Sequence, residues 1–147
     1  MKENSDKKSQ ALFGTIFLLA QRWQTMGDRY LAAENITAKQ WLLLASIEHL
    51  GGKPATLNEI TRAFGTSRQN VKQLALGLEK RGFLNISQDD QDKRALRFEI
   101  TSQNRNFWQK RAQADQKYIS DLFKGIQAKD LEITLKTMQV LLINTQK

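Results

Sequence analysis

Polar and basic residues gather on one face of a short predicted helix, and they are residue types that recognise DNA bases. The helix begins after Ser67 and extends to about Arg81. A rotation of about 100° per residue separates its apolar stripe from an amide-rich and basic face. Gln and Asn side chains pair with adenine, and Arg pairs with guanine. The face comprises Gln69, Lys72, Gln73 and Lys80, with Arg68 and Asn70 flanking its start. It favours a helix that contacts bases, and an ordinary solvated face is the alternative. Leu76 also turns partly outward, and the sequence offers no account of it.

A second candidate contact lies in the wholly polar segment from Gln88 to Arg94. A narrow minor groove concentrates negative potential and attracts Arg, the residue type at position 94. Asp92 stands two residues earlier and could orient that guanidinium through a bidentate pair. Calcium binding is disfavoured because Lys93 and Arg94 interrupt any ligand spacing. We expect Asp92, Lys93 and Arg94 to contact DNA, with a solvated loop as the alternative and no metal.

Most catalytic chemistry lacks its residues in this chain. There is no Cys, which excludes a disulfide framework, a Cys-ligated zinc site and a thiol switch. His49 is the only His, and no nucleophile–base pair, Gly-rich phosphate loop or metal cluster is evident. We therefore expect no enzyme activity and no cofactor.

The elements that hold these residues follow from local signals. Thr56 to Glu59 form a capping box that opens a short helix with Leu57, Ile60 and Phe64 inward, and Gly65 ends it. The Ser67 helix follows, with Val71, Leu74, Ala75 and Leu78 inward, and Gly82 ends it. Apolar residues then alternate with polar ones in two runs, Leu84 and Ile86, then Leu96, Phe98 and Ile100, which predicts a hairpin with a long charged tip. The order is helix, turn, helix, wing.

Longer helices flank this unit. The first is expected over about Gln10–Ala33, with a heptad-spaced apolar seam of Leu12, Ile16, Leu19, Trp23, Met26 and Tyr30. The seam fits packing within the domain or against another chain. Thr37 and Gln40 open a second helix, with Trp41, Leu44, Ala45 and Ile47 inward, that ends by Gly51. A third begins at Thr101 or Ser102 and reaches about Lys124, and a last helix presents Leu131, Leu135, Met138 and Leu142.

The composition agrees with a DNA-binding protein. The chain has 147 residues, 40% of them hydrophobic and 26% charged, and a formal net charge of +8. This length suits one compact domain or two small ones, and the positive charge weakly favours a polyanionic partner. Neither a targeting signal nor a membrane span is evident, so we expect a cytoplasmic protein that does not engage membranes.

The stretch from Thr56 to Thr101 carries a specific order of residues. These are Leu57, Ile60, Gly65, Ser67, Val71, the run Leu78-Glu79-Lys80-Arg81-Gly82-Phe83-Leu84, then Asp92-Lys93-Arg94-Ala95 and Ile100-Thr101. This order resembles the winged helix–turn–helix of the MarR (multiple antibiotic resistance regulator) family, and the flanking helices match as well. Two departures stand out: Gln73 replaces an Arg common in relatives, and the Cys of a redox-sensing branch is absent.

The resemblance implies a mainly α fold with a small β-hairpin wing. It implies one domain over 1–147, with a winged helix–turn–helix lobe over 37–101 and dimerisation helices over 10–34 and 102–147. The Ser67 helix would be the recognition helix and Arg94 the wing arginine, oriented by Asp92. The family's ligand pocket would here draw on Trp23, Tyr30, Trp41 and His49, although each aromatic residue also fits a plain core position.

The expected function is therefore transcription regulation, with repression as the expected mode. A homodimer would bind a pseudo-palindromic double-stranded DNA operator, and a small-molecule effector would release it. The recognition residues would be Ser67, Arg68, Gln69, Asn70, Lys72 and Gln73, and the phosphate contacts would include Arg62, Lys72, Lys80, Lys93 and Arg97. The alternative is a winged-helix module that binds a protein and has no specific DNA affinity.

Overall fold

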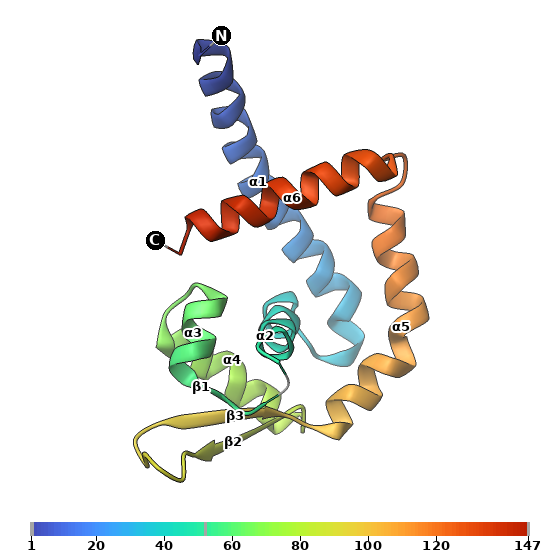
Figure 1. Ribbon diagram of the computed structural model, residues 1–147. Helices are drawn as coiled ribbons and strands as arrows, with labels where there is room; N and C mark the ends of the chain where they lie inside the picture. Colours follow the sequence, from blue (N-terminus) through green and yellow to red (C-terminus); the bar gives the residue numbers. More distant parts are fainter. Residues whose placement is uncertain (1, 52, 147) are drawn as a thin grey trace. The chain divides into compact units, whose positions relative to one another are not determined.

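The computed structural model describes residues 2–51 and 53–146 and is mainly helical, with one small antiparallel sheet (Figure 1). Met1, Gly52 and Lys147, which the expected domain bounds include, lie outside the described residues. The chain divides into two compact units, Met1–Asn106 and Phe107–Lys147. The elements are α1 (Lys2–Leu31), the 3-10 turn η1 (Ala32–Glu34), α2 (Ala38–His49), β1 (Ala55–Thr56), α3 (Leu57–Phe64), α4 (Arg68–Lys80), β2 (Leu84–Gln88), β3 (Leu96–Ile100), α5 (Ser102–Leu122) and α6 (Ala128–Asn144).

The predicted hairpin is confirmed, and it belongs to a three-stranded sheet of order β1-β3-β2. Phe98 pairs with Ile86 on one side and with Ala55 on the other, in antiparallel register. β1 was not predicted, because a strand of two residues is too short to show an alternating pattern. This strand ties the hairpin to the start of α3.

The core of the lobe forms where α2, α3 and α4 meet the sheet. Figure 1 shows the three helices on one side of the hairpin. The buried side chains include Leu43, Ile47, Ile60, Val71, Leu78, Phe83, Leu84 and Phe98. On α2, the predicted burial of Leu44 and Ile47 is confirmed. The prediction that Trp41 is buried is wrong, because its side chain is 44% exposed. Residues 41–45 are apolar throughout, so periodicity could not show that Leu43 faces the core instead.

The N-terminus of α2 is held by two acceptors. The expected capping box is present, since the Thr37 hydroxyl accepts from the Gln40 amide and the Gln40 side chain accepts from the Thr37 amide. In addition, Oδ1 of Asp28, on α1, accepts from the Ala38 amide at 2.7 Å. The helices approach closely here, because a Cβ added at Gly27 would lie 3.0 Å from the Ala38 Cβ. Asp28 thus fixes where the long α1 helix meets the lobe.

Replacing Asp28 with Ala should lower the free energy of unfolding by about 1 kcal/mol, the usual effect of losing a helix cap. Asp6→Ala, at an exposed site of the same helix, is the matched control and should change the free energy of unfolding little. Urea titration of both variants measures the difference. Equal effects of the two substitutions would show that the Asp28–Ala38 bond contributes nothing.

The first helix is longer than expected and begins at Lys2 rather than near Gln10. Its first residues are polar and carry no apolar period, but a Glu3–Lys7 ion pair of 3.1 Å supports the helix there. Much of the predicted seam is exposed in the single chain, including Trp23 at 41% and Leu12 at 40%.

The last helix is also apolar and uncovered. Leu135 and Leu142 on α6 are 60% and 64% exposed, and none of the α6 residues is buried. Single exposed apolar residues are ordinary, but rows of them along whole helices indicate a surface that is covered by something else. Among the described residues, no helix is long and apolar enough to cross a membrane.

Candidate nucleic-acid interface

The candidate recognition helix α4 presents the polar face that the sequence predicts. Val71, Ala75 and Leu78 are buried, and Gln69, Lys72 and Gln73 are exposed on the other side. Ser67 caps the helix, because its hydroxyl accepts from the Asn70 amide at 3.2 Å. The Ser67 side chain therefore has a role within the fold, and a base contact would have to be made alongside it.

The turn before α4 depends on glycine. Gly65 ends α3 with φ of 76° and donates its amide to the Thr61 carbonyl. This left-handed conformation strains any residue with a Cβ, so the sharp change of direction between the two helices needs Gly. The turn sets the angle at which α4 leaves the lobe.

Two of the predicted base-reading residues have partners inside the lobe. Nη1 of Arg68 donates to Oδ1 of Asn58, on α3, at 2.6 Å. Asn70 is half-buried, and its side-chain amide donates to the Thr66 hydroxyl at 3.2 Å. These contacts join the two helices at the turn. The exposed side-chain amides on α4 are those of Gln69 and Gln73, which makes them the stronger candidates for reading bases.

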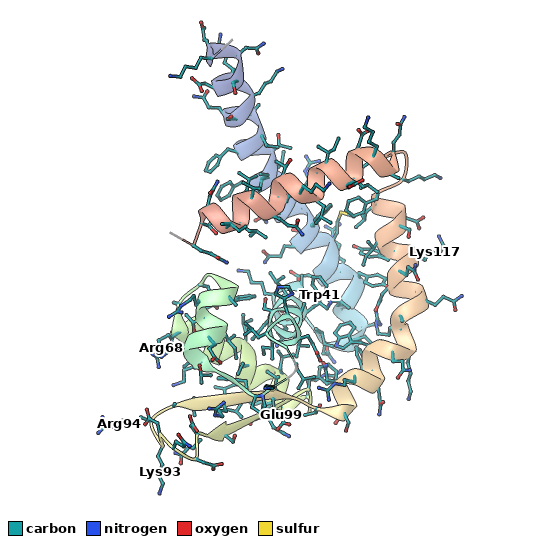
Figure 2. The ribbon with its side chains drawn as sticks, in the orientation of Figure 1. Trp41, Arg68, Lys93, Arg94, Glu99 and Lys117 are labelled. Carbon is teal, nitrogen blue, oxygen red and sulfur yellow. The ribbon has the colours of Figure 1, made fainter. Side chains whose placement is uncertain are left out.

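The wing tip carries Asp92, Lys93 and Arg94, and all three are exposed. In the view of Figure 2, Lys93 and Arg94 project from the end of the hairpin, and Arg68 lies at the same edge of the lobe. The expected side-chain pair between Asp92 and Arg94 is not what the structure has. Asp92 Oδ1 accepts instead from the backbone amide of Arg94 at 3.0 Å, because the two residues share a tight turn. Asp92 therefore orients the backbone that carries Arg94 and leaves the guanidinium exposed.

The wing does contain an ion pair between a guanidinium and a carboxylate, and it is formed by Arg97 and Asp89. Nη2 of Arg97 donates to Oδ2 of Asp89 at 3.2 Å, and Nη1 donates to the Pro54 carbonyl at 3.1 Å. Arg97, expected to contact a phosphate, thus joins the wing to the segment before β1. The β2–β3 register pairs Ser87 with Arg97 and makes Asp89 a diagonal neighbour of Arg97, so counting the register would have found the pair.

The Arg97–Asp89 pair orders the loop that holds Arg94. Asp89 also accepts from the Gln91 amide through Oδ1, and its own amide donates to the Ala95 carbonyl. The hydrogen bond from Arg97 lowers the pKa of Asp89, and the Gln91 amide adds to the effect. The same bond raises the pKa of Arg97. Because its carboxyl pKa is lowered, Asp89 stabilises the folded wing at pH values above the ordinary carboxyl pKa of about 4. This contribution is lost as the pH falls through the lowered pKa.

Replacing Asp89 with Asn should loosen the wing tip at neutral pH, as protonation of Asp89 should do in the parent chain. We expect faster hydrogen exchange at the Gln91 amide and an unchanged exchange rate at buried amides such as that of Leu78. Asp90→Asn, at the adjacent exposed carboxylate, is the control. Unchanged exchange at Gln91 in Asp89→Asn would show that the Arg97 pair does not order the tip.

The remaining phosphate candidates are exposed at the ends of the two helices. Arg62 lies in the last turn of α3 and Lys80 in the last turn of α4. Lys72 is exposed on α4 itself. The exposed basic groups thus occur on α3, on α4 and at the wing tip, all within the first compact unit.

The four expected ligand-binding residues lie on two helices. Trp23 and Tyr30 are on α1, where Trp23 is exposed and Tyr30 is half-buried. Trp41 and His49 are both exposed and stand at opposite ends of α2, so about 12 Å of helix separates them. Figure 2 labels Trp41 on α2. Their assignment to a ligand stays a prediction.

Comparison with known proteins supports the family resemblance. The model of the MarR family matches residues 34–95, which contain α2, the helix–turn–helix and most of the wing. BadR of Rhodopseudomonas palustris, a transcriptional activatory protein, is 25% identical over 142 residues, 92% of this chain and 79% of BadR. The transcriptional repressor MprA of Escherichia coli is 29% identical over 80 residues, 54% of this chain, and the match spans less than half of MprA, 46%.

The fold is shared with solved protein structures. The crystal structure of AbfR of Staphylococcus epidermidis has a TM-score of 0.82 at 19% identity, covering 100% of this chain and 99% of AbfR. The structure of reduced AbfR bound to DNA has a TM-score of 0.65 at 22% identity, covering 97% and 99%. The family match over residues 34–95, the curated relatives and the shared fold lead to one conclusion: this chain is similar to transcriptional regulators of the MarR family.

Proposed function

We propose that this chain binds a pseudo-palindromic operator as a homodimer, with α4 in the major groove and the wing tip in the adjacent minor groove. The observation that carries the proposal is the exposure of Gln69, Gln73 and Arg94. The backbone near these side chains is held by hydrogen bonds within the lobe, from the Asn70 amide to Ser67 at the start of α4 and from the Arg94 amide to Asp92 in the wing. A major groove about 12 Å wide admits a helix such as α4. AbfR, which has this fold, has been solved bound to DNA.

The homodimer accounts for the uncovered apolar faces. α1 buries only Leu31 among its described residues, and the apolar residues of α6 are exposed or half-buried. A second copy offers the same faces, so two-fold pairing of these helices removes them from water. A two-fold dimer in turn presents two lobes to two half-sites.

Regulation by a small molecule is the finer part of the proposal. A ligand held near Trp23, Tyr30, Trp41 and His49 would change DNA affinity only as far as it binds two lobe arrangements unequally. BadR is named for activation and MprA for repression, so the proposal covers operator binding and does not choose between activation and repression.

Selection of duplexes from a random-sequence pool with the purified chain tests the proposal. We expect enrichment of a pseudo-palindrome whose half-sites lie about one helical turn apart. Binding to the selected duplex should weaken steeply with salt, because lysines and arginines replace counterions on the phosphates. Failure to enrich any sequence, or binding that ignores salt, would overturn the proposal and favour a module that binds protein.

A further inference from the structure

Leu76 is an exposed apolar residue in the middle of the polar face of α4. Its relative exposure is 50%, and α4 carries no other exposed large apolar side chain. With about 100° per residue, Gln69, Lys72, Gln73 and Lys80 all lie within about 60° of Leu76 around the helix axis. Leu76 thus lies near the centre of the surface that is proposed to face DNA, and not at its edge.

The residues on this face of α4 have the spacing of a helix that contacts DNA along its length. Gln69, Lys72, Gln73 and Leu76 stand at positions i, i+3, i+4 and i+7, the spacing of the residues with which homeodomain helices contact the major groove. They span about 10 Å of helix. Bases contacted near Gln69 and bases contacted near Leu76 are therefore different steps of the same half-site.

We propose that Leu76 is a specificity-determining residue that contacts the C5-methyl group of a thymine in each half-site. Among the four bases, thymine is the one that offers an apolar group in the major groove, and apolar side chains recognise it there. A protein partner is a poorer occupant, because one Leu surrounded by amides and amines does not make the apolar centre of a protein interface. The flanking Lys72 and Lys80 instead complement a phosphate backbone. The inference rests on the proposed function, since it names a base contact made by the same helix.

A double-mutant cycle between protein and DNA tests the contact. The probe is the duplex selected from the random pool, with each thymine replaced in turn by uracil in both half-sites, which removes the methyl group and keeps base pairing. The proteins are the parent chain and Leu76→Ala. At one position, uracil should weaken binding of the parent chain about fourfold for each methyl lost, or about 15-fold for the two half-sites. The same replacement should weaken Leu76→Ala far less.

The matched control is Leu50→Ala, which removes a 40%-exposed Leu at the end of α2. This variant should show the same uracil sensitivity as the parent chain. Any effect of uracil on DNA shape acts on all three proteins and cancels in the comparison. Circular dichroism melting of each variant confirms that it is folded before titration.

The outcomes separate the two claims. Coupling between Leu76 and one thymine supports the contact. Equal uracil sensitivity of the parent chain and Leu76→Ala at every thymine overturns it while leaving operator binding intact. If the pool yields no selected duplex, the proposed function itself fails, and the assignment of Leu76 fails with it.

Discussion

Arg94→Ala should weaken binding to the selected duplex by about 1–3 kcal/mol for each wing, a loss of roughly 5- to 150-fold for each half-site. The exposed guanidinium stands at the end of a hairpin whose tip is ordered by the Asp92 turn and the Arg97–Asp89 pair. Because the tip is ordered before binding, little conformational entropy is lost when Arg94 enters the groove. Fluorescence anisotropy titration at fixed salt measures the change.

Arg22→Ala serves as the control, because it removes the same charge from an exposed position on α1. It should weaken binding only slightly, through the change in net charge. Arg94→Lys keeps the charge but loses the planar guanidinium, so its affinity should fall between those of the parent chain and Arg94→Ala. If Arg94→Ala and Arg22→Ala weaken binding equally, the wing arginine has no groove contact.

The elements of the lobe were predictable where the governing interactions are local. The capping boxes at Thr37 and Thr56 join residues three positions apart, and both are present as expected. The glycine that ends α3 acts through its own backbone conformation and was found in the same way. These signals need no knowledge of the rest of the fold.

Features that depend on distant neighbours were not predictable in this way. The acceptor that Asp28 supplies to Ala38 joins residues ten positions apart on different helices. Arg97 reaches Pro54 across 43 positions, which no local pattern encodes. β1 exists because β3 offers it a partner, and its two residues alone do not predict a strand.

The candidate site also has features that local sequence predicts and features that it does not. The exposed residues of α4 follow from a rotation of about 100° per residue, and the structure agrees with that face. Arg68, Asn70 and Arg97 have hydrogen-bond partners within the lobe that their residue types do not reveal. Residue type alone therefore suggested DNA contacts for side chains that already have a partner in the lobe. Exposure and hydrogen bonding therefore leave fewer candidates for base contacts than residue type alone did.

The proposed homodimer predicts a large effect of Leu135→Glu on α6. In the single chain this side chain is 60% exposed, so the substitution should not disturb the fold of the protomer. In a dimer that buries this face, two carboxylates would lose their water without gaining partners, which costs several kcal/mol for each ion. By analytical ultracentrifugation at micromolar concentration, we expect this variant to be a monomer and the parent chain to be a dimer.

Loss of the dimer should nearly abolish operator binding, because one lobe alone reaches one half-site. Linking two binding modules raises affinity by about 10²- to 10⁴-fold, and a monomer forgoes that gain. Thr137→Glu adds the same charge about 200° around α6 and should remain dimeric with near-parent affinity. A folded Leu135→Glu chain that still dimerises and binds the operator as the parent does would show that the α6 face is covered by something other than a second copy. The uncovered seam of α1 would then be the remaining candidate for the dimer contact.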